Sequence, residues 1–467
     1  RVAAGKAKIP APIVVPAPTS STTPPAPAVT DSGALLSSIS LVAGTTIGAG
    51  ILALPAATLP SGLLPSSSLM IAVWLYMAAS GFLIVEATLY TRAQLGQEDL
   101  GFLATVQHQL GRWGAIAAGT VYIFIHYALL VAYTARGGDI LATALTYLQQ
   151  RFSFSQSVLP LASSPVLHPP VPLWCGHVVF SCLLGSLLFW GSERFVGRLN
   201  SILLIIIILA FSGLLTVTIP QIALPQLLRQ HWVAVGSAIP VMFVTFVYHS
   251  VVPVITTQLN GNRSQIRKAI LLGSLIPLSM FLLWNAAILG SVEWTPLETA
   301  AENIFDPIET LRMGSAHPRL GLAISVFSEL AVMTSFIGFA YGLLSVLNDV
   351  RSIGTSVAKT QPRREKTSVK LLSYVLIFVP PLILSLLSPS IFFDAIDASG
   401  ALGTSFLFGI LPAVMVWKLR YNTLTSTGKG RSEPWIPGGK FSLIVMIGIA
   451  AFVIVQYILG REPFISF

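Results

Sequence analysis

The chain has 467 residues, of which 54% are hydrophobic and 10% are charged, and its mean hydropathy is +0.78. These values exclude a soluble globular domain and a disordered chain, and they indicate a membrane protein. Eleven apolar stretches match the roughly 20 residues that a membrane-spanning helix needs, near 35–60, 64–91, 113–148, 173–191, 197–219, 234–258, 268–290, 320–347, 371–388, 391–417 and 441–459. They lack the alternation of barrel strands, so we predict an all-α polytopic membrane protein with about eleven transmembrane helices.

The net charge of +9 follows from an uneven distribution of basic residues between the two sides of the membrane. If successive helices alternate in direction, 21 of the 27 Lys and Arg residues fall on the side of the N-terminus and six on the other side. By the positive-inside rule, the N-terminus and the basic loops face the cytoplasm or an equivalent such as the stroma. We therefore expect a lipid bilayer and no nucleic acid as the partner of this charge.

Residues 1–34 precede the first apolar stretch and are rich in Ala, Pro, Ser and Thr, with no acid before Asp31. We predict a disordered leader there, because this composition cannot form a core. A basic, acid-poor leader suits a transit peptide and favours the plastid (chloroplast) inner envelope. The alternative is a plain disordered tail on a bacterial inner-membrane protein.

The first apolar stretch contains GTTIGAGILALP (44–55), with three glycines and a proline. Gly costs a helix interior about 1 kcal/mol and Pro about 3 kcal/mol, so a continuous helix is unfavourable here. One interpretation is a small-residue packing face formed by Gly44 and Gly48. The other is an unwound segment around Gly48, Ala49 and Gly50, whose free amides bind an anionic group.

The sixth apolar stretch favours the second interpretation. Pro240 and Pro253 bracket the polar triplet Tyr248, His249 and Ser250, and the backbone near 249–253 is predicted to leave the helix. Two interrupted spans, the first and the sixth, are typical of two inverted five-helix repeats with a binding site at the membrane midplane between them. The predicted units are 35–220 (helices 1–5), 231–419 (helices 6–10) and 440–460 (helix 11).

Several segments resemble the aromatic amino acid permeases, the tryptophan- and tyrosine-specific transporters of bacteria and their plastid relatives. They are GTTIGAGILALP, IVEATLY (84–90), HYALLVAY (126–133), PVMFVTFVYHSVVPVI (240–255), TSFIGFAYGL (334–343) and LFGILPAVMVWKLRY (407–421). The resemblance covers roughly residues 35 to 460. It implies the fold of the amino acid/polyamine/organocation superfamily, which is the LeuT-like fold, and transport by rocking of helices 1, 2, 6 and 7 against the others.

An amino acid substrate needs partners for its carboxylate, its ammonium group and its side chain. We assign the carboxylate to the amides of Gly48, Ala49 and Gly50, assisted by the hydroxyls of Thr45 and Thr46. Freed carbonyls near Ile47 and Phe246 are expected to face the ammonium group. The candidates for aromatic recognition are Tyr122, His126, Tyr133, Tyr248, His249, Phe336 and Tyr341, with Ser250 at the second break.

Coupling to an ion suggests a second group of residues. Glu86 and Glu329 are ionisable groups inside predicted spans, where such groups are functional candidates. Glu86 fits either a protonatable coupling residue or a neutral structural acid. Thr334 and Ser335 form a hydroxyl pair at the depth where sodium-coupled members of this fold place a sodium site. Because the nearest relatives resemble proton symporters, we favour proton coupling and keep a sodium-coupled neutral amino acid transporter as the alternative.

A pigment-binding membrane subunit is a hypothesis of a different class, suggested by His126 and His249. It would leave the Gly and Pro interruptions unexplained. The sequence contains no HExxH, GxSxG or GxGD pattern and no metal-ligand spacing, so we expect no enzyme, no catalytic residue, no metal and no cofactor.

Overall fold

The computed structural model describes residues 31–48, 50–97, 100–156, 170–292, 306–314, 318–354, 367–388, 391–422 and 434–460. In these residues, ten helices are long and apolar enough to cross a membrane, and the number is eleven if the bent pair α1 (Asp31–Thr46) and α2 (Gly50–Thr58) is one span. The predicted all-helical membrane architecture is thereby confirmed. Helix α1 begins at Asp31, inside the range predicted as a leader, and residues 1–30 lie outside the described residues.

The long helices follow the predicted spans closely. After the first span they are α3 (Leu63–Leu95), α4 (Phe102–Gln156), α5 (Leu173–Trp190), α6 (Glu193–Thr218), α8 (Ile239–Thr245) with α9 (Val252–Gln258), α10 (Arg263–Ser291), α12 (Pro318–Gly354), α13 (Thr367–Leu387), α14 (Ile391–Ala398) continued by η5 (Ser399–Ile410) and α15 (Leu411–Trp417), and α16 (Gly439–Gly460). Short elements connect them, namely η1 (Ile219–Gln221), α7 (Leu224–Leu228), η2 (Trp232–Ala238), η3 (His249–Val251), α11 (Pro307–Gly314) and η6 (Lys418–Asn422).

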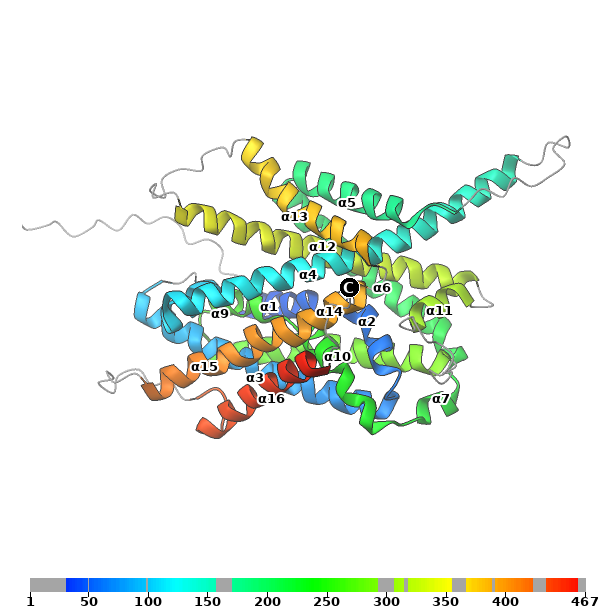
Figure 1. Ribbon diagram of the computed structural model, residues 1–467. Helices are drawn as coiled ribbons and strands as arrows, with labels where there is room; N and C mark the ends of the chain where they lie inside the picture. The colour runs from blue at the N-terminus through cyan, green and yellow to red at the C-terminus, as the bar shows by residue number, and fades with distance from the viewer. Residues whose placement is uncertain are drawn as a thin grey trace, which may run out of the picture.

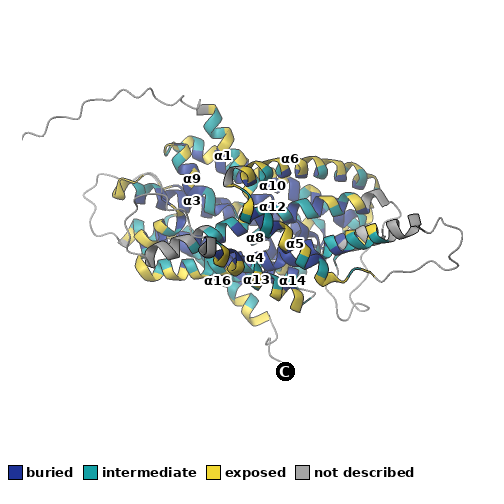
Figure 2. Ribbon diagram, turned by 90° about the horizontal axis from the view of Figure 1, so that it is seen from above, coloured by how far each residue is buried: buried dark blue, intermediate teal, exposed yellow. Residues whose placement is uncertain are grey.

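The helices form one elongated bundle with a buried centre. Figure 1 shows α5 and α13 along one edge and α16 along the other, with α4 and α12 between them. Buried positions lie along the middle of the bundle and exposed ones on its outer faces (Figure 2). We call the end at which α1 begins the basic side, after the Lys and Arg residues predicted there, and the other end the opposite side.

Both predicted interruptions are present. The axes of α1 and α2 differ by 54° across the segment that contains Gly48. In the sixth span, α8 ends at Thr245 and η3 begins at His249, so the non-helical residues are 246–248. The prediction of 249–253 was therefore one turn too late. Pro253 lies in the first turn of α9, where a missing amide hydrogen costs the helix nothing.

The basic side is held together by a buried ion pair that joins α3 to η6. Glu86 accepts hydrogen bonds from the Nε and Nη2 atoms of Arg420, at 2.7 and 2.6 Å, and from the amide of Trp435 at 3.1 Å. The Trp435 ring stacks on Phe82, with ring centroids 5.9 Å apart, and lies 4.8 Å from the Arg263 guanidinium carbon. Three hydrogen bonds to one carboxylate fit an ionised Glu86 with a structural role.

We expect Glu86→Ala to lower the melting temperature strongly, because the Arg420 guanidinium would lose its carboxylate partner. Breaking a buried ion pair costs about 3–5 kcal/mol. Thermal unfolding in detergent measures the loss, and the matched control is Glu86→Ala combined with Arg420→Leu, which removes both charges and should be clearly more stable than the single variant. Equal melting temperatures for the two proteins would contradict the structural role of the pair.

Candidate functional site

The two interruptions border a cavity of ≈ 590 Å³, which lies within the size range of small-molecule sites. Helices α4 and α12 line the side of the cavity that faces the two interruptions. Eleven of the predicted site and coupling residues line it, namely Thr45, Thr46, Ile47, Gly48, Gly50, Tyr122, His126, Tyr133, Ser250, Thr334 and Ser335. The structure thus brings the first span, the sixth span and the aromatic positions of the third span to one space.

The cavity opens toward the basic side. Its lining continues through Ser37, Ser40, Ser201 and Gln258, which are exposed polar residues near the basic-side ends of their helices. Toward the opposite side the lining ends, and residues such as Ile51, Leu52 and Phe243 are at most 1% exposed. The conformation is therefore open to one side of the membrane only.

Close backbone contacts hold the first interruption in place. A Cβ atom on Gly48 would lie 2.8 Å from the Ser335 hydroxyl oxygen of α12. A Cβ atom on Gly50 would lie 2.9 Å from the Thr245 hydroxyl oxygen of α8 and 3.2 Å from the Thr245 Cα atom. Gly50 also begins α2, so its amide belongs to the first turn, where helix amides have no partner within the helix. These contacts explain why the sequence has glycine at both positions.

The hydroxyl groups of the lining already donate to their own helices. Thr45 and Thr46 donate to the carbonyls of Leu41 and Val42, at 2.7 and 2.8 Å. Ser335 donates to the Ala331 carbonyl at 2.8 Å, and Thr334 donates within α12 in the same way. A hydroxyl has a single proton, so these oxygen atoms are acceptors toward the cavity. Donation from Thr45 and Thr46 to a substrate carboxylate stays a prediction, and it requires both hydroxyls to turn away from these carbonyls.

Aromatic side chains from α4 and α12 form one wall. The rings of Tyr122 and His126 stack with centroids 4.0 Å apart, and Phe339 lies 5.1 Å from His126 and 5.8 Å from Tyr133. The His126 Nδ1 atom lies 2.7 Å from the Tyr122 carbonyl oxygen, which can only accept, so Nδ1 carries a proton. The other ring nitrogen lies over Gly342, where a Cβ atom would be 2.6 Å away. These rings form a flat, mostly apolar wall that contains one ring nitrogen, Nε2 of His126.

Five predicted substrate contacts lie outside the cavity lining, namely Phe246, Tyr248, His249, Phe336 and Tyr341. Phe246 packs on Phe281, and Phe336 packs on Phe180. Tyr248 and His249 are at most 1% exposed, and both rings hydrogen-bond the Met77 carbonyl, at 3.2 and 3.1 Å. His249 therefore stabilises the second interruption from the side of α3, away from the cavity. His126 and His249 face different spaces, so the described residues do not form the paired-histidine site of the pigment-binding hypothesis.

Three further predicted residues, Ala49, Glu86 and Glu329, are also not among the cavity-lining residues. Ala49 lies outside the described residues. Glu86 belongs to the ion pair on the basic side, and Glu329 is absent from the cavity lining, with its Oε2 atom buried and without a hydrogen-bond partner among the described residues. Among those residues, no group of three or more His, Cys, Asp or Glu side chains is placed to hold a metal ion.

Sequence reasoning missed part of the lining, including Thr245, Gly338, Phe339, Gly342 and Phe408. A signal existed on α12, because Ser335, Gly338, Phe339 and Gly342 follow the i, i+3, i+4, i+7 spacing of one helix face. Phe408 gave no such signal, since it belongs to η5, a π-helix that the hydropathy pattern does not reveal.

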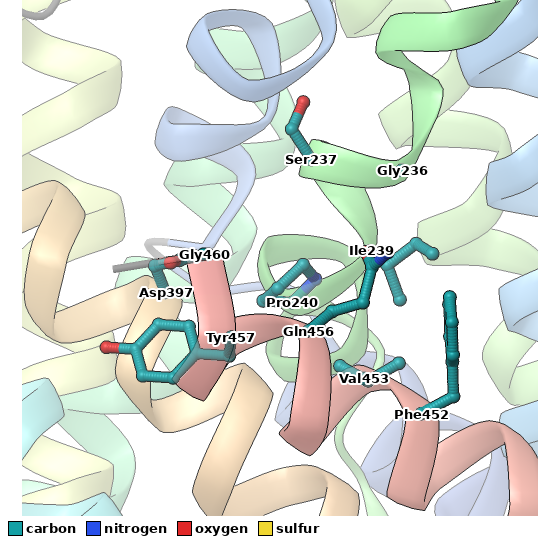
Figure 3. A pocket seen from close by; sticks show the side chains of 10 residues that line it. All are labelled: Gly236, Ser237, Ile239, Pro240, Asp397, Phe452, Val453, Gln456, Tyr457 and Gly460. Carbon is teal, nitrogen blue, oxygen red and sulfur yellow. The ribbon is translucent and has the colours of Figure 1, made fainter. Parts of the chain in front are cut away.

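A smaller cavity of ≈ 210 Å³ lies elsewhere, between η2 and α8 on one side and α14 and α16 on the other. Figure 3 shows Pro240, Asp397 and Tyr457 among its lining side chains. It shares no lining residue with the large cavity, so it is separate from the candidate site.

Two interrupted helices with a cavity between them are the features of a secondary transporter of the LeuT-like fold. The solved structure of MhsT in complex with L-phenylalanine is similar to this chain, with a TM-score of 0.58 and 14% sequence identity, and the match covers 91% of this chain and 98% of MhsT. The chain belongs to the tryptophan/tyrosine permease family, whose match covers residues 31–457.

Bacterial relatives agree with this assignment. The chain is 28% identical to Tyrosine-specific transport system 1 of Haemophilus influenzae, over 88% of this chain and 94% of the relative. It is also 28% identical to the Tryptophan-specific transport protein of the same organism, over 90% of this chain and 94% of the relative. The family and these relatives are transport proteins and not enzymes, and this chain is a multi-pass membrane protein.

We expect Gly50→Ala to reduce transport about tenfold or more, because the added Cβ atom meets the backbone of Thr245. Overpacking of this kind costs about 1–3 kcal/mol, and each 1.4 kcal/mol changes an affinity about tenfold. Initial transport rates in proteoliposomes measure the effect. Gly213→Ala is the matched control, because Gly213 is an exposed helix residue with nothing within 4 Å of an added Cβ atom. Normal transport by Gly50→Ala would contradict the tight contact between α2 and α8.

Proposed function

We propose that this protein is a secondary active transporter of aromatic amino acids, namely tyrosine, tryptophan or phenylalanine, which it carries by alternating access. One observation supports this proposal above all: both helix interruptions and an aromatic wall border a single cavity that is open to one side. The names of the bacterial relatives support the same substrate class, as does the L-phenylalanine complex of the solved structure.

In this proposal the substrate carboxylate binds at the first interruption. The amides of Gly48 and Gly50 bind it at the positive end of α2, and the Thr45 and Thr46 hydroxyls assist only if they turn away from the Leu41 and Val42 carbonyls. Carbonyls at the end of α1, near Ile47, and at the end of α8 accept from the ammonium group. The hydroxyl oxygens of Thr245 and Ser335 add acceptors on either side.

The aromatic ring of the substrate packs between Phe339 and the stacked pair of Tyr122 and His126. With its only proton on Nδ1, His126 has an acceptor in Nε2, which lies against Gly342 in the cavity wall. Such an acceptor suits the phenol hydroxyl of tyrosine or the indole N–H of tryptophan. Phenylalanine, which has neither donor, would leave Nε2 without a partner and bind more weakly.

Proton coupling remains our preferred proposal, with sodium as the alternative. The specific observation in favour of sodium is that Thr334 and Ser335 present hydroxyl oxygens to the cavity beside Gly48, where carbonyls of the first span are close. Sodium requires several such oxygen ligands. The ion pair of Glu86 with Arg420 fits an anchor better than a carboxyl that binds and releases a proton, so we do not assign coupling to Glu86.

We propose that the basic side faces the cytoplasm or stroma and that the N-terminus lies there, as the distribution of Lys and Arg suggests. The plastid inner envelope and the bacterial inner membrane are both compatible with this orientation. The bacterial origin of the relatives supports the second location, whereas the composition of residues 1–34 supports the first.

The proposal predicts uptake of labelled tyrosine, tryptophan and phenylalanine into proteoliposomes under an imposed proton gradient. With one proton per substrate, each pH unit supplies 1.36 kcal/mol and accumulates the substrate up to about tenfold. An imposed sodium gradient at equal pH should produce no accumulation. Gly48→Val should abolish uptake, because its side chain would collide with Ser335.

Two outcomes would contradict this proposal in different ways. Accumulation under the sodium gradient alone would mean that sodium, and not the proton, is the coupling ion. It would also assign Thr334 and Ser335 to the sodium site. No accumulation of any of the three amino acids under either gradient, from a protein that elutes as a single species, would exclude the aromatic substrate class.

A further inference from the structure

Five glycines line the large cavity, and Gly338 of α12 differs from the other four. A Cβ atom added to Gly44, Gly48, Gly50 or Gly342 would lie 2.6–3.1 Å from a side-chain atom of another helix. A Cβ atom added to Gly338 would have no atom of the described residues within 4 Å, apart from its own helix backbone and its neighbours in the chain. Contacts between helices therefore explain four of these glycines and leave Gly338 unexplained.

The backbone conformation does not require glycine at position 338 either. Gly338 lies inside α12 and does not have the positive φ that favours glycine. Glycine in a helix interior is less stable than alanine, because its backbone loses more conformational freedom on folding. Among the usual reasons for such a glycine, the remaining one is the close approach of a ligand to the helix backbone.

Gly338 is an exposed position within a buried stretch of α12. Nearby, Ile337 is 2% exposed and Ala340 is 3% exposed, whereas Gly338 is exposed and lines the cavity. Ser335, Gly338 and Gly342 follow the i, i+3, i+7 spacing of one helix face. The backbone of α12 therefore forms part of the cavity surface at Gly338, with no side chain in front of it.

Gly338 also lies between the two ends of the proposed binding site. Ser335, about 4.5 Å earlier along the axis of α12, lies against Gly48 at the first interruption. Gly342, about 6 Å further along the axis, lies against the Nε2 atom of His126. In the proposed function, the carboxylate and ammonium groups bind at the first interruption, and the polar atom of the aromatic ring reaches His126. A substrate bound in this way places its ring over Gly338.

We infer that Gly338 determines the size of the aromatic side chain that the cavity admits, and that the space in front of it accommodates the second ring of tryptophan. This role rests on the proposed function, because it concerns the choice among the three proposed substrates. The aromatic residues around this space support one another: Tyr122 stacks on His126, and Phe339 packs against His126 and Tyr133. Because these rings are held in place, the width of the space depends on the residue at position 338.

The three proposed substrates differ in the width of their side chains. The indole of tryptophan has two fused rings, whereas phenylalanine and tyrosine have a single ring. A side chain at position 338 would take space from the wider indole before it reached a single ring. One additional carbon group in an apolar pocket changes the discrimination between two substrates about 10–200-fold. Glycine at this position therefore keeps tryptophan among the substrates, and a larger residue would favour phenylalanine and tyrosine.

Uptake of labelled tryptophan, tyrosine and phenylalanine by Gly338→Ala in proteoliposomes tests this role. We expect the half-saturating concentration of tryptophan to rise about tenfold relative to that of phenylalanine. The melting temperature should equal or exceed that of the wild type, because alanine favours the helix and its Cβ atom meets no neighbour. Gly338→Ser, which adds a side chain of similar size with a hydroxyl, should shift the same ratio. Gly213→Ala is the matched control, since Gly213 is an exposed helix glycine outside the cavity, and it should keep the ratio of the wild type.

Wild-type transport of all three amino acids with an unchanged ratio in Gly338→Ala would overturn the inference alone. An equal loss of all three in the variant would also overturn it and would assign Gly338 to helix movement. A Gly338→Ala protein that fails to fold would overturn it as well, because the position would then be packed. A wild type that transports phenylalanine but not tryptophan has the same consequence. A wild type that accumulates none of the three amino acids would instead contradict the proposed function, and this role with it.

Discussion

The structure depends on one constraint, which is that a helix interrupted inside a membrane must have its exposed backbone covered by protein. The first interruption is covered on two sides, by Ser335 of α12 at Gly48 and by Thr245 of α8 at Gly50. The Trp284 indole donates to the Ile51 carbonyl at 3.0 Å and covers the start of α2 from α10. The second interruption is covered by the rings of Tyr248 and His249, both bonded to the Met77 carbonyl. The cavity is the space that this covering leaves open.

Polar contacts between distant helices keep the interruptions aligned with each other. Thr58 at the end of α2 donates to Asn285 of α10 at 2.6 Å, and Asn285 donates to Ser66 of α3 at 3.1 Å. At the basic-side end of α3, the ion pair of Glu86 with Arg420 fixes the same helix against η6. Because lipid offers no driving force for helix association, close packing and such hydrogen bonds determine the relative positions of the helices. The first, second and seventh spans are consequently joined as one unit.

Local features of the sequence predicted the spans and the first interruption, because hydropathy and the helix cost of Gly and Pro act over a few residues. They also predicted Tyr122, His126, Thr334 and Ser335 as lining residues. The prediction for His249 did not distinguish between a polar residue that faces the cavity and one that supports the chain from behind. That difference depends on the rotation of the sixth span about its own axis. Contacts with α3, such as the one between His249 and the Met77 carbonyl, determine this rotation. The partner of Glu86 is 334 residues away in the chain, so no local pattern could have identified it.

The distribution of charge also accounts for the side to which the cavity opens. On the opposite side, the ion pair of Arg136 with Asp306 ties α4 to the segment before α11, and both side chains are about nine-tenths buried. On the basic side, the cavity mouth is lined by neutral polar groups such as Ser37, Ser40 and Gln258, which bind each other and water about equally well. Closing that mouth therefore gains little free energy, whereas opening the other side requires a buried ion pair to separate. A conformation open to the basic side is the expected resting state of such an arrangement, and a change that weakens the Arg136 pair is the most direct way to shift it.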